Sequence, residues 1–196
     1  VGAEVQSTVA EYLERGGVLN VENMCHFLAT EFGGGEWSFD DPVDLPETGV
    51  YHPDHPGVTI EELQSTFDPE RPTVGLWFYE SHWTVENVAY VDALVWALEA
   101  NGVDAFPVFT TPTREEPDKR DARWVAERWF SEGEEASVDA VVSTFMYSLT
   151  MDERGRTASE PDDPATEGFL DELDVPVLQA MVSMRPRSEY REDDAG

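Results

Sequence analysis

The sequence predicts an α/β fold: an open, four-stranded parallel sheet of flavodoxin-like order with helices on both faces, preceded by a helical extension. From residue 73 onward, apolar runs of strand length alternate with helical patterns, as is typical of parallel sheets. A hydrophobic content of 40%, with 6 Trp and 10 Phe, indicates a packed core. We expect a helical extension with a Pro/Asp-rich loop at 1–70, an α/β domain at 71–185 and an acidic tail at 186–196.

The first 70 residues predict helices and no strand. Apolar residues recur at helical spacing over Glu4–Arg15 and over Val21–Phe32, and glycines follow both patterns. A loop rich in Pro and Asp comes next, and a short helix is expected at Thr59–Phe67.

Strands and helices alternate in the second part. The expected strands are Val74–Tyr79, Ala105–Phe109, Ala140–Phe145 and Val175–Ala180. The expected helices are one capped by Thr84 that ends at Asn101-Gly102, one at Asp118–Phe130 and one at Ala165–Leu173, with a long excursion at Ser148–Pro164.

Two prolines predict the order of the strands. Pro107 lies in the second strand and Pro176 near the start of the fourth, and a missing N–H is tolerated at the edge of a sheet. The order 2-1-3-4 places both prolines at edges. It also puts a topological switch point between the first and third strands, where such sheets bind ligands at their carboxyl ends.

The charge is strongly negative: 42 acidic residues against 12 basic ones give −30. This excludes a general nucleic-acid binder, which needs Lys and Arg for phosphate contacts, and binding to an anionic membrane surface. Acidic residues spread along the chain, with Lys119 as the one lysine, suit a salt-loving organism, because high salt screens self-repulsion. An acidic protein with a polycationic partner is the other interpretation.

A single cysteine, Cys25, excludes an internal disulfide and a Cys-based zinc cluster. We therefore expect a cytoplasmic protein. No apolar run approaches the ~18–20 residues that span a bilayer, and no signal peptide is recognisable. The chain begins with Val, which suggests an excerpt of a longer protein.

Polar residues follow every predicted strand, so they should meet in one crevice at the carboxyl edge of the sheet. They are Glu80, Ser81, His82, Thr110, Thr111, Thr144, Tyr147 and Gln179. A neutral imidazole such as His82 can bind a divalent metal or move a proton near neutral pH. Glu80 would be its partner only if the strand continued past Tyr79. The other interpretation is that His82 caps the next helix or packs against Trp83.

Two further histidines, His52 and His55, flank Pro53 and Asp54 and carry ligand types for a metal site. A plain surface turn explains the same pattern. Phosphate-loop, dinucleotide-binding and serine-hydrolase motifs are not found in the sequence. We therefore expect no ATP hydrolysis by this chain.

Several motifs, in order, resemble the large subunit of cobaltochelatases, the CobN family, to which the magnesium chelatase H subunit is related. They are the run Pro72–Trp83 ending in Ser-His-Trp, with Asn87 after it, Phe106–Phe109, Gly49–Asp54, Asp139–Thr144 with Ser143 where the family has Asn, and Val175–Ala180.

The resemblance implies insertion of cobalt, as the substrate metal, into a corrin such as hydrogenobyrinic acid a,c-diamide. It also implies ATP hydrolysis on AAA+ partner subunits, and that this chain is an internal fragment. Because the chain has no phosphate loop and would hold only part of the pocket, we expect it to be inactive alone. Its negative charge, taken with the resemblance, leads us to expect a haloarchaeal origin. The candidate catalytic residues are His82 and Glu80. The candidate substrate-binding residues are Ser81, Trp83, Asn87, Thr144 and Gln179, and the candidate metal ligands are His52 and His55.

Three other functions stay open at this point: a stand-alone flavodoxin-like module for a small ligand, a porphyrin-binding segment like that of the magnesium chelatase H subunit, and a scaffold with no ligand. A small-ligand module would need a phosphate cradle after the first strand, and His82-Trp83 makes a poor one.

Overall fold

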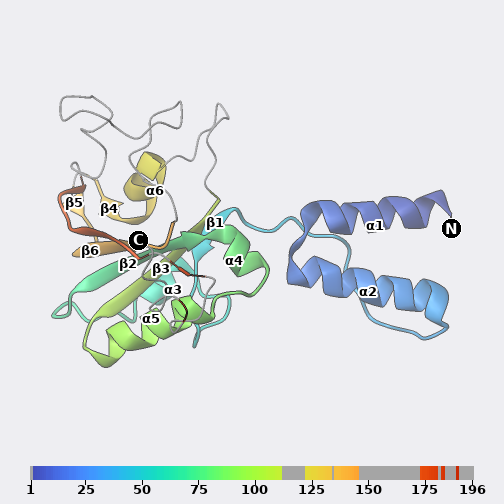
Figure 1. Cartoon of the computed structure of the whole chain (residues 1–196), viewed down its shortest axis with the longest axis horizontal. Helices are drawn as coiled ribbons and strands as arrows, with labels where there is room; N and C mark the ends of the chain where they lie inside the picture. Colours follow the sequence, from blue (N-terminus) through green and yellow to red (C-terminus); the bar gives the residue numbers. More distant parts are fainter. Residues whose placement is uncertain are drawn as a thin grey trace.

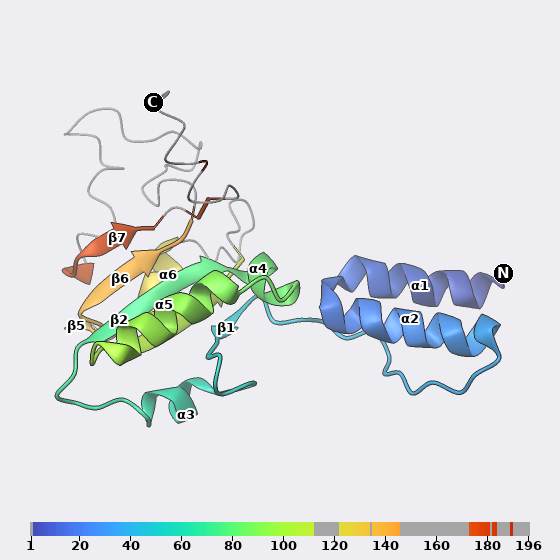
Figure 2. The same cartoon turned by 60° about the horizontal axis from the view of Figure 1, so that its bottom comes forward.

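The computed structural model consists of a helical hairpin that stands to one side of an α/β domain (Figures 1 and 2). It describes residues 2–111, 122–133, 135–145, 173–180, 182, 183 and 189. The hairpin comprises α1 (Ala3–Arg15) and α2 (Gly17–Gly33). The linking Gly16 has φ 63°, a left-handed conformation that glycine adopts without steric cost.

Contacts between the helices and the segment that returns from α2 hold the hairpin together. Tyr12 is buried against Phe27, and its hydroxyl donates to the backbone of Asp40. The side chain of Asn20 both donates to the Val43 carbonyl and accepts from the Val43 N–H, at 2.9 and 3.0 Å. The predicted helices in this region are confirmed, and α2 begins four residues before the predicted start.

The domain is built on a five-stranded sheet in the order β1-β3-β2-β6-β7. The strands are β1 (Thr48–Val50), β2 (Thr73–Tyr79), β3 (Asp104–Thr110), β6 (Ala140–Ser143) and β7 (Val177–Gln179). All neighbours are parallel except β1, which runs antiparallel to β3. A small hairpin, β4 (Ser131–Glu132) with β5 (Glu135–Ala136), completes the described strands. The α/β class is therefore confirmed.

The prediction of a four-stranded sheet with its second strand at an edge is wrong, as is the prediction of no strand in the first 70 residues. The second predicted strand, β3, lies between β1 and β2. Pro107 is compatible with this position because the pairing uses its carbonyl, which accepts from the Tyr51 N–H at 3.0 Å. The register sets Pro107 opposite Tyr51, one residue past the end of β1, so the one ladder hydrogen bond that its missing N–H cannot make falls at the very end of this pairing.

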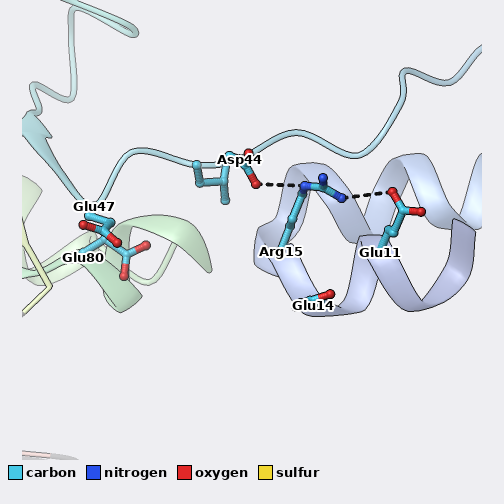
Figure 3. A pocket seen from close by; sticks show the side chains of 7 residues that line it. Glu11, Glu14, Arg15, Asp44, Glu47 and Glu80 are labelled. Atoms are coloured by element: carbon cyan, nitrogen blue, oxygen red, sulfur yellow. Dashed lines mark hydrogen bonds and ion pairs between the residues drawn. The ribbon is translucent and has the colours of Figure 1, made fainter. Parts of the chain in front are cut away.

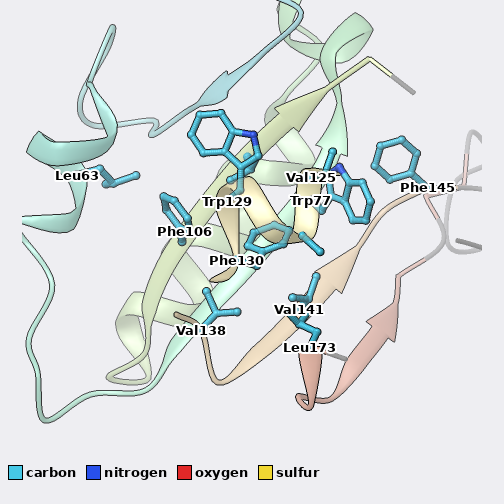
Figure 4. Close-up of a cluster of buried hydrophobic side chains, with 12 residues drawn as sticks. Leu63, Trp77, Phe106, Val125, Trp129, Phe130, Val138, Val141, Phe145 and Leu173 are labelled. Carbon is cyan, nitrogen blue, oxygen red and sulfur yellow. The ribbon is translucent and has the colours of Figure 1, made fainter. Parts of the chain in front are cut away.

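Helices cover both faces of the sheet, as predicted. Against one face α6 (Ala122–Trp129) packs over a cluster of aromatic and branched side chains (Figure 4). Its members include Trp77, Phe106, Phe130, Val141 and Phe145. On the other face α5 (Ala89–Ala100) buries Val91 and Val95 against Leu76, Phe78 and Phe109. The short helix α3 (Ile60–Gln64) adds Leu63 to the first cluster.

Thr84 does not cap α5, contrary to the prediction. A short helix, α4 (Glu80–Thr84), follows β2 without a linker, and Thr84 is its last residue. The chain then turns through Glu86, which has φ 56°, and the N-cap of α5 is Val88. The sequence pattern indicated one long helix because it gave no sign of this turn before the apolar face of α5.

Several predictions concern residues outside the described part of the chain. They are most of the helix at Ala165–Leu173, the excursion at Ser148–Pro164, the rim residue Tyr147, the start of the helix at Asp118–Phe130 and nearly all of the tail at 186–196.

We expect the melting temperature of the chain to rise with KCl concentration, because a net charge of −30 repels itself in dilute buffer. In about 1 M salt the Debye length falls to about 3 Å, so this repulsion is screened. Two arginines already contact carboxylates: Arg15 contacts Glu11 and Asp44, and Arg71 contacts Asp68 and Asp104. Thermal melts across KCl concentrations, with NaCl as a control for ion identity, test this. A constant or falling midpoint would contradict it.

Candidate functional site

The candidate site lies where β2 and β6 end, next to each other at the carboxyl edge of the sheet. The chain from β2 goes to β3 on one side, and β6 pairs with β2 on the other side. Residues that follow β2 and β6 therefore meet at a topological switch point. This placement of His82 and Thr144 was predicted from the sequence.

His82 is held by a tyrosine that the sequence did not indicate. Its Nδ1 lies 2.7 Å from the hydroxyl of Tyr90, in the first turn of α5. The imidazole also packs against the rings of Tyr79 and Tyr90, with centroids 5.3 and 5.5 Å away. Burial lowers the pKa of His82 from its usual value, so the neutral imidazole predominates at neutral pH.

Thr144 connects this pair to the backbone of β2. Its hydroxyl lies 3.4 Å from the Tyr90 hydroxyl and donates to the Trp77 carbonyl at 3.3 Å, and its N–H donates to the same carbonyl at 2.9 Å. Burial raises the pKa of Tyr90, which therefore keeps its proton. His82, Tyr90, Thr144 and the Trp77 carbonyl form one hydrogen-bonded chain, which we call the His82 relay.

Glu80 lies on a different side of α4 from His82. The strand ends at Tyr79 and Glu80 begins a helix, so side chains two residues apart point about 200° away from each other. Glu80 accepts from the Thr111 hydroxyl at 3.2 Å and lines a cavity of about 500 Å³ beside Glu47 and the hairpin (Figure 3). Burial and the nearby Glu47 carboxylate raise the pKa of Glu80. The two predicted catalytic residues are therefore not partners.

The predicted substrate-binding residues divide between two places. Gln179, on β7, donates to the Phe145 carbonyl at 2.9 Å, and the Phe145 ring packs on Tyr79 beside the His82 relay. Trp83 stacks on Phe109 with ring centroids 4.4 Å apart, on the opposite face of the sheet from Phe145.

Ser81 lies in α4 and Asn87 follows three residues after its end, and both side chains are exposed. Their backbones shape the turn that follows: the Ser81 carbonyl accepts from the Thr84 hydroxyl at 3.1 Å, and the Asn87 N–H donates to the His82 carbonyl at 2.8 Å. These two hydrogen bonds fix the end of the helix that carries His82.

His52 and His55 lie away from the relay. His52 is buried, and its Nε2 lies 2.9 Å from the Glu99 carboxylate while its Nδ1 accepts from the Asp54 N–H at 3.2 Å. His55 packs against the His52 ring, with centroids 4.8 Å apart. Both nitrogens of His52 are thus in use. Over the described residues, no group of three or more His, Cys, Asp or Glu side chains is arranged to hold a metal ion.

None of the helices in the described part of the chain combines the length and the apolar character that crossing a bilayer requires.

Comparison with known proteins gives one consistent family. Residues 10–196 match the family model described as CobN/Magnesium Chelatase. An uncharacterised protein of Methanocaldococcus jannaschii is 26% identical over 100% of this chain and 16% of its own length. The aerobic cobaltochelatase subunit CobN of Pseudomonas aeruginosa is 26% identical over 99% of this chain and 14% of its own length.

A solved structure agrees with these matches. The catalytic subunit of cobaltochelatase from Mycobacterium tuberculosis superposes with a TM-score of 0.70 at 26% identity, over 97% of this chain and 14% of that one. The magnesium-chelatase H protein of Rhodobacter capsulatus is 29% identical over 82% of this chain and 13% of its own length. The chain spans only about one-seventh of the length of the relatives it matches.

Proposed function

The chain belongs to the CobN/magnesium chelatase family, and from this premise we propose that it is a segment of the large subunit of a chelatase that inserts cobalt into a corrin ring. The His82 relay at the switch point of the sheet carries the proposal. It brings a neutral imidazole to the place where sheets of this kind bind ligands.

The direction of the relay supports a role in taking up protons. A divalent metal displaces N–H protons from the ring nitrogens as it enters, and each displaced proton needs an acceptor. The Trp77 carbonyl can only accept a hydrogen bond. A relay in which His82 Nδ1–H donates to Tyr90, Tyr90 to Thr144 and Thr144 to that carbonyl satisfies every member. This direction leaves Nε2 of His82 as the base that takes up the proton.

The remaining site residues have smaller roles in this proposal. Thr144 and Tyr90 fix the tautomer of His82, and Gln179, Ser81, Trp83 and Asn87 contact the corrin or shape its cleft. Glu80 lies on the hairpin side of α4, where burial raises the pKa of its carboxyl. Because His52 already uses both nitrogens, a metal at His52 and His55 is the least supported part of the proposal.

Energy for insertion comes, in this proposal, from AAA+ partner subunits that hydrolyse ATP, since the sequence of this chain has no phosphate loop. The matched relatives are themselves named as subunits. We further propose that the isolated segment is inactive and that it comes from a haloarchaeon, as its net charge of −30 suggests.

One observation favours cobalt over magnesium. The cobaltochelatase matches cover 99% and 97% of this chain, hairpin included, whereas the magnesium-chelatase match covers 82%. A porphyrin-binding segment of a magnesium chelatase is the second candidate, because that relative has the higher identity, 29%.

The test is metal insertion by the longer subunit together with its partner subunits and ATP. We expect cobalt to enter hydrogenobyrinic acid a,c-diamide, followed by the change in the corrin absorption spectrum, and no magnesium to enter protoporphyrin. Insertion of magnesium only would favour the second candidate. Insertion by the 196-residue chain alone would contradict its role as a segment.

A further inference from the structure

Helix α2 carries an apolar stripe that nothing in the described structure covers. Its members are Val18, Val21, Cys25, Leu28 and Phe32. Val18, Val21 and Phe32 are 37%, 41% and 61% exposed, Cys25 is exposed, and Leu28 is half-buried. The spacing alternates between three and four residues, which is the seam that a helix presents to a partner helix. Residues with this spacing usually face a core.

The polarity of α2 is inverted relative to an ordinary surface helix. Asn20 and Asn23 are 0% and 8% exposed. Both hold the returning segment: Asn20 bonds the backbone of Val43, and Asn23 accepts from the Asp40 N–H at 2.9 Å. The face that this protein covers is therefore partly polar, and the apolar face is left for another polypeptide.

The stripe is continuous with an apolar cleft beside the domain. Val18 and Leu19 line a cleft of about 490 Å³ together with Leu45, Tyr51, Trp83 and Val88. Large contiguous apolar surfaces of this kind mark sites of contact with another polypeptide. A partner lying along the stripe could insert an apolar side chain into the cleft at the Val18 end.

The length of the relatives and the charge of α2 indicate which polypeptide covers the stripe. The region that matches this chain makes up only 14–16% of the length of the matched proteins. Most of a subunit of this family therefore lies outside the matched region. A second copy of this chain is disfavoured, since α2 contains no Lys or Arg, and Glu22 and Glu31 beside the stripe would face like charges.

We propose that the apolar stripe is an interface inside the longer subunit, where an apolar helix from the polypeptide outside these 196 residues packs along α2. The proposal rests on family membership and the exposed stripe, not on the chelatase reaction. It can therefore fail or succeed independently of cobalt insertion.

Cys25 lies in the middle of the stripe and is the one cysteine of this chain, which gives a direct test. The rate at which Cys25 reacts with a small thiol reagent is measured by mass spectrometry of its peptide, in the 196-residue chain and in the longer subunit. We expect the reaction to be at least about 100-fold slower in the longer subunit, because it then requires local opening. The denatured subunit gives the unprotected rate for comparison.

Two outcomes would overturn the proposal. Equal rates in the chain and the longer subunit would show that the stripe stays exposed. A slow rate already in the 196-residue chain would show that this chain or a second copy covers it, and sedimentation velocity tells a dimer from a monomer.

A paired substitution provides a second measurement. We expect V21N/F32N to leave the melting temperature of the 196-residue chain unchanged and to lower that of the longer subunit. The control E22Q/E31Q changes the same helix beside the stripe and should lower neither. Equal effects of the two pairs on the longer subunit would contradict the proposal.

Discussion

Replacing His82 with alanine in the longer subunit is expected to lower the single-turnover rate of cobalt insertion by about 10²- to 10⁴-fold, the usual contribution of a general base. In the proposed mechanism its Nε2 takes up the proton that the metal displaces, and only the neutral imidazole can do so. Burial lowers the pKa of His82 and keeps it neutral. The measurement is the change in corrin absorbance after rapid mixing with cobalt, ATP and the partner subunits.

Two variants serve as controls for this loss. Tyr90→Phe keeps the ring against His82 but removes the hydroxyl 2.7 Å from Nδ1, and we expect a smaller loss, about tenfold, for one hydrogen bond. His26→Ala removes a histidine of the hairpin, whose Nδ1 contacts the Ser38 carbonyl, and should leave insertion unchanged. Unaltered insertion and unaltered corrin affinity in His82→Ala would reduce His82 to a structural residue.

The same residue predicts the pH dependence of the wild-type rate. Because the pKa of His82 is lowered, its protonation occurs at a lower pH than that of a free histidine, about 6.5. Insertion should therefore persist through pH 7 and fall on the acid side with a midpoint below 6.5. The insertion rate of His82→Ala should lack this fall at acid pH.

Trp77→Ala is expected to have the largest effect on stability, a loss of about 3–5 kcal/mol in the free energy of unfolding. Trp77 is 4% exposed, packs on Phe130 and Phe145, and donates from Nε1 to the Thr110 hydroxyl at 2.8 Å. Alanine leaves a cavity at the centre of the sheet and an unpartnered hydroxyl. Because a domain of this size has a total stability of only about 5–15 kcal/mol, the loss is severe.

Trp96→Ala is the matched control for this experiment. Trp96 lies on α5, is 50% exposed, and donates to the Asp54 carboxylate at 3.0 Å. We expect its replacement to cost about 1 kcal/mol or less. Urea unfolding at one fixed KCl concentration compares the two variants, since urea leaves the ionic strength unchanged. Equal losses would contradict the assignment of Trp77 to the core.

The parallel strands β2 and β3 were predictable because they are buried on both faces. Val74–Tyr79 and Ala105–Phe109 are continuous apolar runs, and β2 and β3 extend them by one residue or two. The three-residue strand β1 was not predictable, since Thr-Gly-Val has no periodic pattern and its pairing with β3 depends on tertiary contacts. That missed strand is also why β3 was wrongly placed at an edge.

The candidate site was predictable only in part, for the same reason. Residues directly after strands, such as His82 and Thr144, could be placed from the strand order. Tyr90 could not, because it comes eight residues after His82 and reaches it only through the turn between α4 and α5. The separation of Glu80 from His82 depended on whether the chain continued as a strand or began a helix after Tyr79, and the sequence left this open.

Chemical rescue of His82→Ala tests the proton-uptake role of His82 most directly. Single-turnover cobalt insertion by the variant subunit is measured with and without added imidazole, at several pH values. We predict a slow rate that imidazole partly restores, in proportion to its unprotonated fraction. Insertion at the wild-type rate without imidazole would contradict a role for His82 in taking up the displaced proton.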